Sequence, residues 1–242
     1  LMFGTFLRIS SPPVFYRFAT KVAIPLCFTG LAFFLIGIIY AIFYTPVDAQ
    51  QGEVYRVLYV HVPSAWLSMF IYVVAFFYAI LYWVWRTDVS AIMLRASLPT
   101  GAWMTVVALV TGSLWGKPTW GTYWVWDARL TTELVLLFIY LGLIAVGNLI
   151  DDSSKTDKAL SLITLFGFVN VPLIYFSVVF FNTLHQGFSL GATNAEMALE
   201  IKIGLFICTI GAWFLCSGNI LLRAKTLLID READSLWLKS TS

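Results

Sequence analysis

Residues 22–44 read VAIPLCFTGLAFFLIGIIYAIFY, an uncharged run of 23 residues. An α-helix needs about 20 apolar residues to cross the hydrocarbon core of a bilayer. The run is too long for the apolar part of a cleavable signal peptide and lacks a small-residue cleavage site, so it predicts a membrane span. The whole chain has the same character. Of its 242 residues, 60% are hydrophobic and 12% are charged, whereas a globular domain carries about 25% charged residues.

Five further apolar runs predict five more spans. The third run is the weakest, because it contains Pro99, Gly101 and Gly112, and Pro63 with Ser64 is placed to open the second. The five runs cover about residues 64–85, 96–115, 130–150, 159–181 and 199–222. The sequence therefore predicts an all-α bundle of six transmembrane helices, forming one domain over residues 1–242.

The distribution of Lys and Arg predicts the orientation of this bundle. Six spans place both termini on one side, which then holds eleven basic residues against four on the other. The positive-inside rule puts the richer side, with both termini, in the cytoplasm. The exterior segments are then about 45–63, 116–129 and 182–198.

Composition also excludes several function classes. The net charge of +2 makes nucleic acid an improbable partner. The three cysteines, Cys27, Cys208 and Cys216, form neither C-x-x-C nor C-x-x-C-H, so they predict apolar packing rather than a redox pair or covalent haem attachment. We expect no ionisable side chain in mid-membrane, which argues against an ion pump or a proton-driven carrier.

The only two histidines, His61 and His185, both fall in predicted exterior segments. Each taken singly fits an interfacial side chain that hydrogen-bonds to lipid headgroups or to backbone. Their placement on one face of the membrane is a modest additional indication of a shared site.

The exterior segment between them is rich in tryptophan. Residues 115–129 read WGKPTWGTYWVWDAR and hold four of the ten tryptophans, Trp115, Trp120, Trp124 and Trp126. An aromatic belt at the bilayer interface explains one or two of these. The density of the loop instead predicts a broad apolar surface that suits a large, flat ligand.

Together the three exterior segments predict a haem site. Two neutral imidazoles, His61 and His185, can bind one iron from opposite faces while the Trp-rich loop covers the edge of the macrocycle. Arg56, Arg129 and Lys117 are candidate partners for the haem propionates, although interfacial snorkelling explains Lys117 equally well. Asp127 is placed either to cap the fourth helix or to pair with Arg129.

Residues 120–131, WGTYWVWDARLT, resemble the "WWD" signature WGxxWxWD of the haem-handling protein superfamily. Within it, the six-span layout, the chain length and the single histidine on each flanking exterior segment resemble the CcmC family of cytochrome c maturation. The resemblance covers essentially the whole chain. The signature positions are Trp120, Gly121, Trp124, Trp126 and Asp127, and none departs from the pattern.

The resemblance implies a multi-pass protein of the bacterial inner membrane that binds haem b without a covalent bond. His61 and His185 would be the axial ligands, and the Trp-rich loop at about 115–130 would hold the haem on the periplasmic face. It also implies delivery to the haem chaperone CcmE, together with the small protein CcmD and the ABC transporter subunits CcmA and CcmB. It implies a haem-presenting protein more than a classical enzyme.

Three other functions stay open on the residues alone. A transporter subunit could move haem across the bilayer, and a membrane redox cytochrome could use it for electron transfer. In a purely structural subunit, the histidines and the Trp-rich loop would be incidental.

Overall fold

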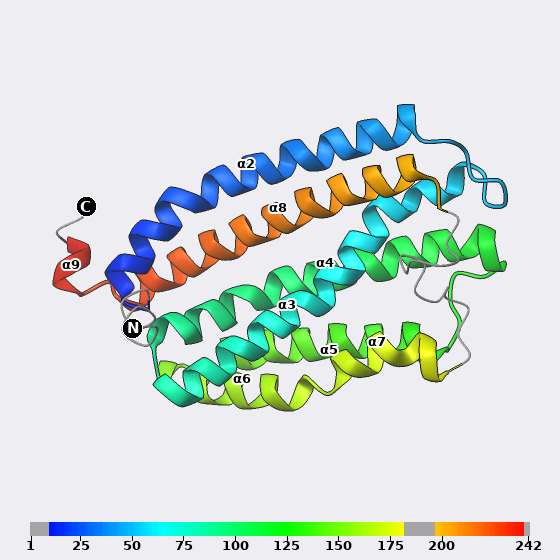
Figure 1. Ribbon diagram of the computed structural model, residues 1–242. Helices are drawn as coiled ribbons and strands as arrows, with labels where there is room; N and C mark the ends of the chain where they lie inside the picture. The colour runs from blue at the N-terminus through cyan, green and yellow to red at the C-terminus, as the bar shows by residue number, and fades with distance from the viewer. Residues whose placement is uncertain (1–9, 182–196, 240–242) are drawn as a thin grey trace.

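The computed structural model describes residues 10–181 and 197–239, which form eight α-helices, one 3-10 helix and no strand (Figure 1). The elements are α2 (Pro12–Tyr44), η1 (Glu53–Val57), α3 (Leu58–Trp85), α4 (Asp88–Trp120), α5 (Ala128–Leu149), α6 (Ser153–Gly167), α7 (Asn170–Phe180), α8 (Leu199–Arg231) and α9 (Leu236–Lys239). Six helical segments of the described chain are long and apolar enough to cross a membrane, with α6 and α7 together making the fifth. The predicted all-α, six-span architecture is confirmed.

The helices lie in three layers, with α2 and α8 in one, α3 and α4 in the middle, and α5, α6 and α7 in the third (Figure 1). The antiparallel α2–α8 pair is held by glycines at its interface. A methyl group on Gly30 would collide with the backbone of Leu215, and one on Gly211 with the backbone of Phe34. Small residues allow this close approach, as is common between membrane helices, which lack a hydrophobic driving force for association.

Two buried tyrosines join the middle and third layers. The hydroxyl of Tyr140 donates to the carbonyl of Ser68 at 2.8 Å, and that of Tyr72 donates to the carbonyl of Thr164 at 3.2 Å. Each phenol hydroxyl therefore has a hydrogen-bond partner inside the apolar bundle, where an unpaired polar group would destabilise the fold.

The second and fifth spans differ in their helix boundaries from the sequence predictions. Pro63 lies inside α3 and does not open it, because η1 leads directly into a helix that begins at Leu58. The fifth span is not one continuous helix but breaks between Gly167 and Asn170. Pro172 has no N–H to offer the carbonyl four residues earlier. By contrast, the third span is an unbroken helix despite its internal prolines and glycines.

The first turn of α2 and the last turns of α8 lie at the same end of the bundle (Figure 1). There, the ring of Trp237 meets that of Tyr16 edge to face, with 5.7 Å between the centroids. The even number of spans is thus confirmed, while the cytoplasmic location of this end and the single-domain organisation stay predictions.

Candidate functional site

His61 lies in the first turn of α3 and is held by the neighbouring helix α4. Its Nδ1 is 3.0 Å from the carbonyl oxygen of Ala108 and 3.1 Å from Oγ1 of Thr111. Because a carbonyl oxygen can only accept, Nδ1 carries the proton in the neutral ring and donates it. The lone pair is then on Nε2, which is how a second-shell carbonyl prepares a histidine for a metal.

Two α4 residues shape the space around the His61 ring. A methyl group on Gly112 would lie only 2.9 Å from Cε1 of His61, so the absence of a side chain there makes room for the imidazole. The ring of Trp115 meets His61 edge to face, with 5.7 Å between the centroids and 79° between the planes. Glycine and tryptophan together fix where the imidazole can sit.

A small cavity of about 30 Å³ adjoins His61 and joins three helices. Its polar and aromatic lining comes from His61 on α3, Trp120 at the end of α4, and Arg129 and Glu133 on α5. The rest of its wall is apolar, formed by Ala65, Ala108, Leu109, Gly112 and Leu130. The structure thus brings together four predicted site residues: His61, Trp115, Trp120 and Arg129.

Glu133 is a site residue that the sequence reasoning missed. It is only 6% exposed, and its Oε1 accepts from Oγ of Ser68 at 2.7 Å, while Oε2 has no hydrogen-bond partner among the described residues. Arg129, one turn earlier on α5, donates from Nη1 to the carbonyl of Ile174 at 2.9 Å. Glu133 lies near the start of α5, so the prediction that no ionisable side chain lies in mid-membrane stays a prediction. The signal was one acidic residue within an apolar span, which marks a functional position by default.

Gln51 is a second residue that was missed. Its Oε1 accepts from Nε1 of Trp115 at 2.7 Å. The preceding turn is fixed by Asp48, whose Oδ1 accepts from the backbone N–H groups of Gln50 and Gln51 at 2.9 and 2.7 Å. An Asp followed by a Gly four residues later predicts a turn, but nothing local indicates which side chain the turn meets.

The predicted Trp-rich loop is shorter than expected, because α4 continues to Trp120. Gly121 ends that helix with a φ of 80°, in the left-handed region that glycine adopts most easily. In the connection that follows, Trp124 and Trp126 meet edge to face at 5.4 Å. Trp124 buries an Nε1 that has no partner among the described residues, whereas Trp126 is 78% exposed.

Asp127 caps the helix that carries Arg129 and Glu133. Its Oδ1 accepts from the backbone N–H of Leu130 at 2.8 Å, as an N-cap side chain does. The cap prediction is confirmed. It sets the first turn of α5 against the cavity.

The two other cationic candidates have structural partners and do not line the cavity. Arg56 donates to the carbonyl of Ala41 and to Thr45, and pairs with Glu53, so it caps the C-terminus of α2. Lys117 donates from Nζ to the carbonyl of Gly121 at 3.1 Å. Their predicted contacts with propionates stay predictions.

His185 lies outside the described residues, so its role as the second iron ligand stays a prediction. Within residues 10–181 and 197–239, no group of three or more His, Cys, Asp or Glu side chains could hold a metal ion. His61 is the single histidine of that part of the chain. The site as described is one imidazole beside a mainly apolar cavity that Trp120, Arg129 and Glu133 also line.

Comparison with known proteins identifies the family. The family model described as "CcmC: Heme exporter protein C" matches residues 5–239. "Heme exporter protein C" of Escherichia coli (strain K12) is 38% identical over 237 residues, covering 98% of this chain and 96% of that protein. The same-named protein of Bradyrhizobium diazoefficiens is 41% identical over 202 residues, covering 82% and 76%. "Putative cytochrome c biosynthesis ccmC-like mitochondrial protein" of Marchantia polymorpha is 36% identical over 203 residues, covering 83% and 86%. The chain belongs to the CcmC family.

Proposed function

We propose that this chain binds haem as cargo beside His61 and presents it for cytochrome c maturation. The observation that carries the proposal is the hydrogen bond from Nδ1 of His61 to the carbonyl of Ala108, at 3.0 Å. It leaves the lone pair of a neutral imidazole on Nε2, as an axial ligand requires. Family membership supports haem as the cargo, since the relatives are named for haem export and cytochrome c biosynthesis.

In this proposal His61 and His185 bind the iron of haem b from opposite faces. Trp115 and Trp120 wall the site, and Arg129 receives a propionate. Its guanidinium already donates to one carbonyl, that of Ile174, from Nη1. A guanidinium has five N–H donors, so further donors are available to a carboxylate.

The attachment is non-covalent, which suits a transfer role. The chain has no C-x-x-C-H motif, and its three cysteines lie on α2 and α8. Release of haem then requires only exchange of the two imidazoles. We propose the haem chaperone CcmE as acceptor on the periplasmic face of the bacterial inner membrane, with CcmD, CcmA and CcmB as further partners.

The iron-ligand assignment is tested by haem copurification. We expect His61→Ala and His185→Ala each to lose most of the bound haem, measured by Soret absorbance per mole of chain. Thr209→Ala is a suitable control, because within the described part of the chain its hydroxyl donates to the carbonyl of Leu205 in the same helix, α8. Normal haem content and an unchanged spectrum in both histidine variants would refute the assignment.

The delivery of haem to CcmE is tested by replacing Trp126, whose side chain is exposed. We expect Trp126→Ala to lower covalent loading of CcmE by this chain while leaving membrane insertion intact. Trp103→Ala is a matched control, since Trp103 is 66% exposed on α4 but lies outside the loop. Equal loading by both variants would show that Trp126 is only an interfacial anchor.

A further inference from the structure

A second cavity, of about 410 Å³, lies at the opposite end of the bundle, and we name it the distal cavity. It is formed where the end of α3 meets the starts of α4 and α6 and the end of α8. Arg86, which lines it, follows His61 by 25 residues along α3, which is about 37 Å at 1.5 Å per residue. The distal cavity is therefore separate from the haem site.

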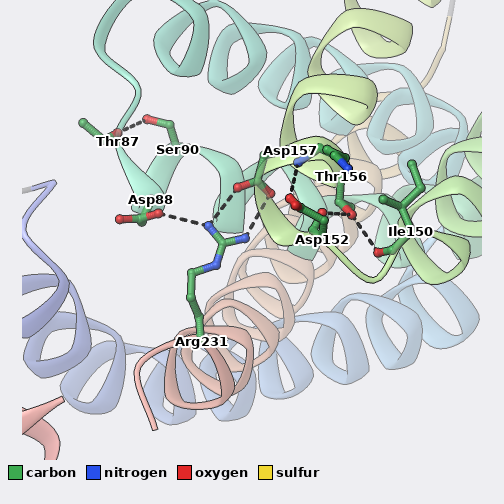
Figure 2. A network of polar contacts seen from close by, with 9 residues as sticks. Thr87, Asp88, Ser90, Ile150, Asp152, Thr156, Asp157 and Arg231 are labelled. Carbon is green, nitrogen blue, oxygen red and sulfur yellow. Dashed lines mark hydrogen bonds and ion pairs between the residues drawn. The ribbon is translucent and has the colours of Figure 1, made fainter. Parts of the chain in front are cut away.

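Part of its wall is a closed ion-pair network. Figure 2 shows the guanidinium of Arg231 between Asp157 and Asp88. Both oxygens of Asp157 accept from it at 2.9 Å, and Oδ1 of Asp88 accepts at 3.2 Å. Asp157 is only 6% exposed, so this bidentate pair is a fixed part of the fold whose two charges cancel.

Two other cations on the wall have no such partner. Neither Arg86 nor Lys158 forms an ion pair with a described residue, and both line the distal cavity. With Asp88 as the remaining carboxylate on the wall, the lining carries three cations and two anions. The excess positive charge comes from the two exposed, unpaired side chains.

Arg86 occupies an unusual backbone conformation and stacks on two aromatic rings. Arg86 ends α3 in the left-handed region, with a φ of 53°, where glycine is normally favoured. Its guanidinium lies 4.3 Å from the ring centroid of Trp83 and 5.1 Å from that of Tyr82. A cation stacked on tryptophan at the end of a membrane helix lies at the level of lipid headgroups.

Hydroxyl groups complete the lining. Ser153 and Ser154, in the first turn of α6, face the distal cavity and can donate to an anion. The cap of this helix is Asp152, whose pKa is lowered because its carboxylate accepts from the backbone N–H of Lys155. The carboxylate of Asp152 is thus hydrogen-bonded to the first turn of α6, and Asp152 does not line the distal cavity.

We propose that the distal cavity binds the phosphate group of an anionic ligand, and that the phosphodiester of an anionic phospholipid is its source. Arg86 and Lys158 would pair with the phosphate, and the Ser153 and Ser154 hydroxyls would donate to its oxygens. Basic pockets between membrane helices bind such headgroups. The stacking of Arg86 on Trp83 favours a lipid over phosphate free in solution.

The test is native mass spectrometry of the full-length chain in detergent, titrated with phosphatidylglycerol or with phosphatidylcholine. We expect tighter binding of phosphatidylglycerol. Arg86→Asn, which tolerates the left-handed backbone, and Lys158→Gln should each weaken it about fivefold, the effect of one cation near a membrane surface. Lys155→Gln is the matched control, because Lys155 is exposed on the same helix but does not line the cavity.

Two further measurements sharpen the result. Asp88→Asn should tighten phosphatidylglycerol binding, because it removes an anion from the wall and leaves the Asp157 pair intact. Millimolar inorganic phosphate should compete poorly; if it displaces the lipid completely, the site takes free phosphate and the lipid assignment is wrong. Equal binding of phosphatidylglycerol and phosphatidylcholine would overturn the proposed site. So would a Lys155→Gln variant that weakens phosphatidylglycerol binding as much as Arg86→Asn and Lys158→Gln do. Unchanged haem content in every variant separates this result from that of the haem proposal.

Discussion

The indole of Trp115 is hydrogen-bonded to Gln51 and at the same time walls His61. Nε1 of Trp115 lies 2.7 Å from Oε1 of Gln51, and the Trp115 ring meets the imidazole edge to face. Gln51 belongs to the connection between α2 and η1, whereas Trp115 belongs to α4. A turn that precedes α3 in the chain therefore sets the orientation of the aromatic neighbour of His61.

This relationship predicts the effect of replacing Gln51. Gln51→Leu removes the acceptor at similar volume, so Trp115 should loosen against His61 and haem should dissociate about fivefold faster. That factor corresponds to about 1 kcal/mol, the net contribution of a typical hydrogen bond. The measurement is the rate of haem transfer from the purified chain to apomyoglobin. Gln50→Leu is the matched control, since the adjacent Gln50 is exposed.

A double-mutant cycle shows whether Gln51 acts through Trp115. In a Trp115→Phe background the indole N–H is gone, so Gln51→Leu should have no further effect on the transfer rate. A fivefold effect that persists in that background would mean that Gln51 acts by another route.

Gly112 predicts a steric test of the His61 pocket. A methyl group there would lie 2.9 Å from Cε1 of His61, so Gly112→Ala should displace the imidazole. We expect haem retention to fall about tenfold, within the 1–3 kcal/mol that overpacking costs. Gly142→Ala is the control, because a methyl group on Gly142 would meet nothing within 4 Å. Equal haem retention in both variants would contradict the packing described for His61.

The buried carboxyl of Glu133 predicts a stability effect at Ser68. Ser68→Ala removes the hydroxyl that donates to Oε1 at 2.7 Å and leaves the carboxyl without its partner. The expected loss is about 1–3 kcal/mol, the penalty for an unsatisfied buried polar group. Thermal unfolding in detergent measures it.

The control for this prediction is the double variant Ser68→Ala/Glu133→Leu. It removes both polar partners, so it should recover part of the loss. A double variant less stable than Ser68→Ala would show that Glu133 stabilises the fold through another contact.

The bilayer explains why the architecture could be predicted from the sequence. An apolar run long enough to span is a local property, and each of the six runs is helical, the fifth as the two helices α6 and α7. Asp127 was predictable for the same reason, since a cap acts within one helical turn. The prediction that Pro63 opens the second span was wrong, because the 3-10 helix η1 precedes it and α3 already begins at Leu58.

The candidate site was only partly predictable. Its tryptophans and His61 stand out by residue type and clustering. The contacts that fix the imidazole come from positions 108, 111 and 112 on another helix, where Ala, Thr and Gly carry no chemical signal of their own. Gln51 and Glu133 likewise gain their roles only through packing between segments distant in sequence.

The central claim is that Nε2 of His61 binds the haem iron, and an imidazole rescue tests it most directly. The measurement is the visible absorption spectrum of haem-loaded His61→Gly in detergent, recorded with and without added imidazole. The account predicts a low-spin six-coordinate spectrum for the unsubstituted chain, its loss in His61→Gly, and its return when imidazole fills the vacated pocket. A low-spin spectrum that persists in His61→Gly without imidazole would contradict the claim.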